Sequence, residues 1–199
     1  MGTTGIFAVF TDRATTGTNT VTSGSRPKAA DLQIATTGST YSDCQTFSED
    51  LATGLITISD AQPLSKQIKN VCLRNVGASE LTVTMKAVDL VDAEAGCTGD
   101  EAASGDATCG TGAGELSDLV AVNTNKIDCV TGAFGPTEGA WLSVLGGTGS
   151  MAIGTVAPGS QACVRIELTY APLNTTATQQ LRAQSDTATW RFAFDGATA

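Results

Sequence analysis

The chain contains no histidine among its 199 residues. Histidine is the commonest general base and the commonest zinc ligand in proteins, so its absence excludes Ser-His-Asp and Cys-His catalytic groups and H-E-x-x-H metalloprotease sites. The remaining alternatives are the Ser65-Lys66 pair and the carboxylates of a flexible acidic segment. Neither has the rigid surroundings that catalysis needs, so we expect no catalytic residues and no cofactor.

Long apolar runs and an excess of basic residues are also missing. No apolar run approaches the roughly 18 residues that a membrane-spanning helix requires. Eleven Lys and Arg residues against twenty Asp and Glu residues give a net charge of -9. A nucleic-acid backbone or an anionic lipid surface would therefore repel the molecule on average. We expect no nucleic-acid partner and no membrane span.

Aromatic residues make up only 5% of the chain, and Lys-rich or Glu-rich helical stretches are lacking, whereas Gly and Thr are abundant. This composition favours strands and turns over helices. The expected strands, which are short apolar or alternating segments between Gly or Pro turns, cover residues 5–10, 31–35, 54–59, 67–76, 81–88, 119–130, 140–145, 151–156, 162–170 and 187–194. Their regular spacing predicts an all-β fold, a β-sandwich. We expect residues 67–76 and 81–88 to form a hairpin.

A single domain over residues 25–199 is the simplest organisation, because no disordered linker separates two cores. Its main excursion is the loop 89–118, which is rich in Gly and Ala and contains eight of the twenty acidic residues and no basic residue. Clustered carboxylates suit calcium, but this loop lacks D-x-D-x-D-G ligand spacing, and acidic loops are usually just solvated. We therefore predict no metal ligands.

No two of the six cysteines have C-x-x-C spacing, which cysteine-only zinc sites usually show. Disulfides are favoured over thiolate ligands, and they imply an oxidising compartment. Cys72 and Cys163 lie opposite the alternating apolar residues of their strands, so we predict a bridge between neighbouring strands. Cys97 and Cys109 flank a short loop, and a bridge there would remove about 3 kcal/mol of unfolded-state entropy. The remaining two, paired by elimination, are Cys44 and Cys129.

An apolar segment lies at the N-terminus, over residues 5–10, and Thr, Gly and Ser follow it. In a strand, successive side chains point to opposite faces, so Ile6, Ala8 and Phe10 would lie on one face and Phe7 and Val9 on the other. The simplest interpretation is an edge strand of its own domain. A short apolar strand at a free terminus can also pair with an open sheet edge of another molecule. We predict this second role, with residues 1–24 as donor strand and flexible tether.

Several short motifs follow one another along the chain: FAVFTD at 7–12, NTVTSG at 19–24, DLQI at 31–34, ITISDAQP at 56–63, KNVCLRNVG at 69–77, VAPGS at 156–160 and ATWRFAF at 188–194. Their order resembles that of the TasA/camelysin family of secreted biofilm-matrix fibre subunits, which are substrates of a dedicated signal peptidase. The resemblance spans nearly the whole chain. The six cysteines and the acidic loop depart from the better-known Gram-positive members.

The resemblance implies a jelly-roll-like β-sandwich that polymerises into an extracellular fibre, in which the N-terminal strand of one subunit completes the sheet of the next. The partner is then a further copy of the chain, joined head to tail. The resemblance leaves open whether an accessory protein assists assembly. The family is secreted to the extracellular matrix or cell surface. Its signal is cut just before the apolar N-terminal segment, so Met1 is not expected to be the original start.

Two other functions compete with the fibre subunit. The first is a monomeric cell-surface or adhesive β-sandwich module, which would stay monomeric with a free N-terminus. The second is a secreted metalloprotease, because relatives in the family carry that label. The missing histidine opposes it, since no His-Glu zinc site can form.

Overall fold

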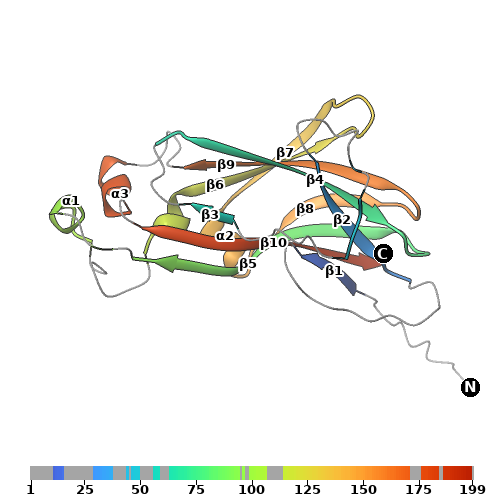
Figure 1. The fold of residues 1–199 in the computed structure, drawn as a ribbon, viewed down its shortest axis with the longest axis horizontal. Coiled ribbons are helices and arrows are strands. Elements are labelled where there is room, and N and C mark those ends of the chain that lie inside the picture. The colour runs from blue at the N-terminus through green and yellow to red at the C-terminus, as the bar shows by residue number, and fades with distance from the viewer. Residues whose placement is uncertain are drawn as a thin grey trace, which may run out of the picture.

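The structure is a computed structural model that describes residues 11–15, 29–37, 44, 46–49, 56–58, 63–94, 96, 99–106, 114–170, 176–183 and 186–198. It confirms the all-β prediction: two antiparallel sheets pack face to face as a sandwich (Figure 1). The predicted N-terminal strand over 5–10 lies outside the described residues, as do Cys97 and Cys109. No helix among the described residues has the length and apolar character needed to span a bilayer.

Sheet A has the strand order β1-β10-β5-β8, and β3 also pairs with β10. Its strands are β1 (Thr11–Thr15), β3 (Ile56–Ile58), β5 (Leu81–Ala93), β8 (Met151–Val156) and β10 (Thr187–Thr198). Sheet B has the order β2-β4-β9-β6-β7. Its strands are β2 (Leu32–Thr37), β4 (Lys66–Asn75), β6 (Val120–Ile127), β7 (Phe134–Trp141) and β9 (Gln161–Tyr170). The short helices are α1 (Gly99–Ala103), the 3-10 helix η2 (Leu116–Leu119), α2 (Leu142–Gly146) and α3 (Ala177–Arg182).

The core between the sheets follows from the two-residue period of the strands. Along β5, Leu81, Val83 and Met85 are fully buried, while the intervening Thr82 is exposed. Strands β9 and β10 contribute the same pattern, and the bulkiest fully buried side chains all come from β10: Trp190, Phe192 and Phe194. These side chains belong to one continuous apolar cluster that fills the space between the two sheets.

The hairpin predicted between 67–76 and 81–88 is wrong. Strand β4 pairs with β2 and β9 in sheet B, whereas β5 pairs with β10 and β8 in sheet A. The connection is an arch between the sheets, held by the fully buried Asn75. Its Nδ2 donates to the backbone oxygens of Ser79 (2.7 Å) and Val156 (2.9 Å), and its Oδ1 accepts from Gly77 N (2.9 Å). Alternation predicts which face a residue uses, but not which sheet its strand joins.

Three further boundaries differ from the predictions. Residues 142–146 form α2 rather than the end of a strand, because Leu142 and Leu145 are both buried at helical spacing. Thr11–Thr15, expected in a flexible tether, form β1 against β10. The expected loop excursion 89–118 includes the end of β5, α1 and η2.

Candidate functional site

Four of the six cysteines gather on the outer face of sheet B. Cys72 of β4 and Cys163 of β9 lie directly opposite each other in the ladder, and both are fully buried. They form a small apolar cluster with Ile127, separate from the main core, and Cys44, Phe47 and Cys129 pack against it. The predicted placement of Cys72 and Cys163 opposite the apolar core residues of their strands is confirmed.

The predicted pairing of these cysteines is wrong. Cys44 is bonded to Cys72 (Cα–Cα 6.1 Å), and Cys129 to Cys163 (Cα–Cα 5.3 Å). The Sγ atoms of Cys72 and Cys163 are nonetheless only 3.2 Å apart. The prediction failed because each of these two strand cysteines is bonded to a cysteine in a flanking segment. The two-residue period of a strand carries no information about such a segment.

Replacing Cys44 with Ser should switch the pairing rather than leave a stable free thiol at Cys72. The Cys72 thiolate would attack the adjacent Cys163 sulfur, form a Cys72–Cys163 bond and release Cys129 as the thiolate, with no net oxidation. Peptide mapping under non-reducing conditions should therefore find Cys72 linked to Cys163 and one reactive thiol, on Cys129. The matched Cys129→Ser variant should place the free thiol on Cys44. An intact Cys129–Cys163 bridge in Cys44→Ser would contradict the 3.2 Å approach.

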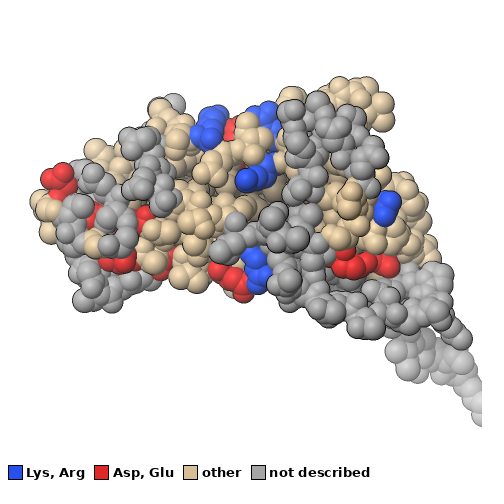
Figure 2. Space-filling view, viewed as in Figure 1, with Lys and Arg blue, Asp and Glu red and all other residues tan. Residues whose placement is uncertain are grey.

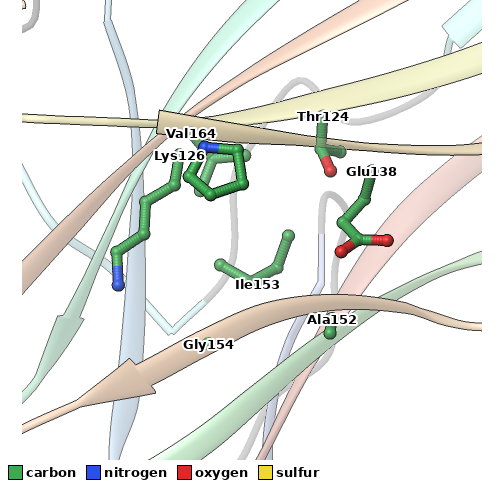
Figure 3. A pocket seen from close by; sticks show the side chains of 8 residues that line it. Thr124, Lys126, Glu138, Ala152, Ile153, Gly154 and Val164 are labelled. Carbon is green, nitrogen blue, oxygen red and sulfur yellow. The ribbon is translucent and has the colours of Figure 1, made fainter. Parts of the chain in front are cut away.

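A pocket of about 280 Å³ opens where β7 of sheet B lies beside β8 of sheet A. Its lining residues are Thr124, Lys126, Pro136, Glu138, Ala152, Ile153, Gly154 and Val164. In the close view the Ile153 side chain lies between β8 and the strand that carries Thr124 and Lys126 (Figure 3). Buried apolar groups thus form the floor, and a cationic and an anionic side chain lie at the rim.

The two strands beside this pocket are both sheet edges. Within the described part of the chain, β7 pairs only with β6 and β8 only with β5. The side chains of β7 are mostly exposed, and Pro136 lacks a backbone N–H, so this strand is protected against pairing. By contrast, Met151, Ile153 and Val156 of β8 are buried. Strand β8 is therefore the edge at which an added strand would continue an apolar face.

Strands β1 and β8 lie at opposite edges of sheet A. Thr11 is the first described residue of β1, and β10 and β5 lie between β1 and β8. The outer side of β8 is thus four strand spacings from β1, roughly 19 Å.

An acidic cluster forms at the end of the sandwich that carries α1 and α3. One carboxylate oxygen each from Glu94, Glu101 and Asp186 lies within 4.8 Å of the other two. Glu101 is fully buried and Asp186 is 2% exposed. Acidic side chains are also visible over this end of the molecule in the space-filling view (Figure 2).

The Asp186 carboxylate is held close to the backbone. Its Oδ2 accepts a hydrogen bond from Glu115 N at 2.6 Å. A Cβ on the preceding Gly114 would lie 2.5 Å from the Asp186 Cγ, so only glycine permits this approach. Burial, together with the charges of Glu94, Glu115 and Glu101, raises the pKa of Asp186 to about 7, although the hydrogen bond from the Glu115 N–H lowers it. Burial, and then the Asp186 charge, also raises the pKa of Tyr170.

Sequence reasoning did not find the β8 pocket or the acidic cluster. Glu94, Glu101 and Glu115 all lie in the predicted acidic loop, but the fold adds Asp186 from the position directly before β10. No spacing pattern links these residues, because Asp186 is far from the other three in the sequence. The five donor-strand residues, Ile6, Phe7, Ala8, Val9 and Phe10, lie outside the described residues.

Neither a protein-family model nor a curated protein matches this chain.

Proposed function

We propose that the protein is a secreted structural subunit with a jelly-roll-like sandwich, which polymerises head to tail by donor-strand addition into a fibre of the TasA/camelysin kind. The observation that carries the proposal is the edge of β8. It pairs only with β5 in the described structure, it continues a buried apolar face, and it adjoins a pocket of about 280 Å³. Main-chain pairing would supply affinity, and alternate side chains of the donor would enter the pocket.

The position of β1 makes the contact heterologous. Thr11 pairs with Ala197 near the C-terminal end of β10, at the end of the sandwich remote from α1 (Figure 1). Ten residues extend up to about 35 Å, whereas the six residues of β8 span roughly 20 Å. Each subunit would thus give one strand and receive one, and such contacts propagate into a filament when the rotation does not close.

The disulfides support secretion. Two bridges link four described cysteines, and no described cysteine is free. Stable bridges of this kind form in oxidising compartments, outside the cytosol.

The direct test is to map where the N-terminal strand binds. A photoreactive benzoylphenylalanine in place of Phe7 should crosslink between subunits in purified fibres. Mass spectrometry should place the crosslinks on the pocket, at β8 or at Thr124 and Val164. The matched control carries the same group at Val130, which is 95% exposed in the β6–β7 connection and should give no specific intersubunit crosslink.

Two outcomes would overturn the proposal. Purified protein that remains monomeric by light scattering and electron microscopy would favour the adhesive module. Crosslinks only within one chain would show that residues 5–10 belong to their own domain.

A further inference from the structure

We infer that Glu94, Glu101 and Asp186 form a calcium-binding site at the α1 end of the sandwich, independent of the strand-addition function. The three residues come from different segments: Glu94 directly follows β5, Glu101 is in α1, and Asp186 directly precedes β10. One oxygen of each carboxylate lies within 4.8 Å of the other two. Two oxygens bound to one Ca²⁺ at about 2.4 Å can be at most about 4.8 Å apart. The separations are therefore compatible with one ion shared by the three carboxylates.

The Asp186 carboxylate gives an independent indication of a missing ligand. This side chain is 2% exposed, and its Oδ2 accepts the Glu115 N–H. Its Oδ1 is buried and has no hydrogen-bond partner. A buried carboxylate oxygen without a partner is costly, and this group faces two further carboxylates. A cation would satisfy the oxygen and offset the repulsion.

The neighbouring charges make the same point. Burial and the carboxylates of Glu94, Glu115 and Glu101 raise the pKa of Asp186. These surroundings disfavour the ionised form of the Asp186 carboxylate. A divalent cation beside it would favour that form, because opposite charge stabilises the ionised state. The fold nonetheless brings the three carboxylates together.

The donor set selects the class of cation. All three groups offer oxygen, and hard cations prefer oxygen, whereas zinc usually takes nitrogen or sulfur ligands. Magnesium demands near-ideal octahedral geometry at 2.0–2.1 Å and gives up its water ligands reluctantly, so it is seldom held by a dedicated all-protein site. Calcium accepts longer distances and irregular coordination, with water or backbone carbonyls completing the shell. Extracellular calcium modules have dissociation constants of about 0.1–1 mM, and we expect this range.

Calcium binding can be measured on the whole chain after treatment with a chelator. At about 10 mM calcium, the melting temperature of the wild type should rise by roughly 3–10 °C, and magnesium should raise it less. Asp186→Asn and Glu94→Gln should lose the calcium response. Asp186→Asn should melt no lower than wild type in chelator, because it removes a buried charge, so lost response would not mean misfolding. The matched control is Asp100→Asn, which removes one exposed charge from α1 and should keep the full response.

Terbium provides a second measurement that does not depend on stability. Tyr170 lies close enough to Asp186 for the Asp186 charge to raise its pKa. Excitation of tyrosine should therefore sensitise emission from terbium bound in the site, and calcium should displace it. The signal should be lost in Asp186→Asn and kept in Asp100→Asn. An equal calcium response in wild type and Asp186→Asn, or no response in wild type, would overturn the inference.

Discussion

Deletion of residues 1–10 should leave a folded protein that forms no fibres. The described core includes none of these residues, and Trp190, Phe192 and Phe194 remain buried between the two sheets. Strand β1 begins at Thr11 and keeps its pairing with β10. Circular dichroism and the melting temperature should therefore match those of the unpolymerised wild type. Light scattering should give a monomer, and electron micrographs should show no filaments.

Substitutions within the donor strand should show which of its two faces enters the pocket. Phe7→Asp with Val9→Asp changes one face, and Phe10→Asp changes the other. The face that enters the β8 pocket should not tolerate aspartate, because a carboxylate would replace an apolar side chain beside Ile153 and Val164. That variant should fail to polymerise, whereas the other should only slow assembly. Additional residues before Met1 should also slow assembly. Fibres that persist after the deletion would show that residues 1–10 are an ordinary edge strand.

Local periodicity was sufficient to predict most of the strands. Strand β8 has the predicted limits, because Met151, Ile153 and Val156 point to the core and Gly or Pro residues flank the segment. The same alternation placed Cys72 and Cys163 on the outer face of sheet B. These features depend only on the face of the strand to which a side chain points. That face follows directly from the alternation of apolar and polar residues in the sequence.

Features that depend on long-range contacts could not be predicted in this way. The connection after Asn75 has the appearance of a hairpin turn, yet its buried amide joins the two sheets. The order of strands in each sheet decides this, and it is set by packing over the whole domain. Likewise, Glu101 and Asp186 are far apart in the sequence and come together only in the folded chain.

The two disulfides of sheet B should be among the largest contributors to stability. Each ties a flanking segment to a central strand, Cys44 to β4 and Cys129 to β9. The bridges span sequence separations of 28 and 34 residues. Loops of this size lose about 4 kcal/mol each of unfolded-state conformational freedom in the chain-entropy model. Together they approach the total stability of many domains, which is about 5–15 kcal/mol.

Each bridge must be removed as a pair, because a single free thiol would exchange with the adjacent bridge. Cys44→Ser with Cys72→Ala, and Cys129→Ser with Cys163→Ala, should each lower the free energy of unfolding by about 4 kcal/mol in denaturant titrations. The corresponding fall in melting temperature is roughly 8–16 °C. Removal of both should leave the chain marginally folded at best. Val130→Ala, in the exposed part of the same connection as Cys129, should change stability by less than about 0.5 kcal/mol. A loss below about 1 kcal/mol for both paired variants would mean that the bridges do not constrain the chain.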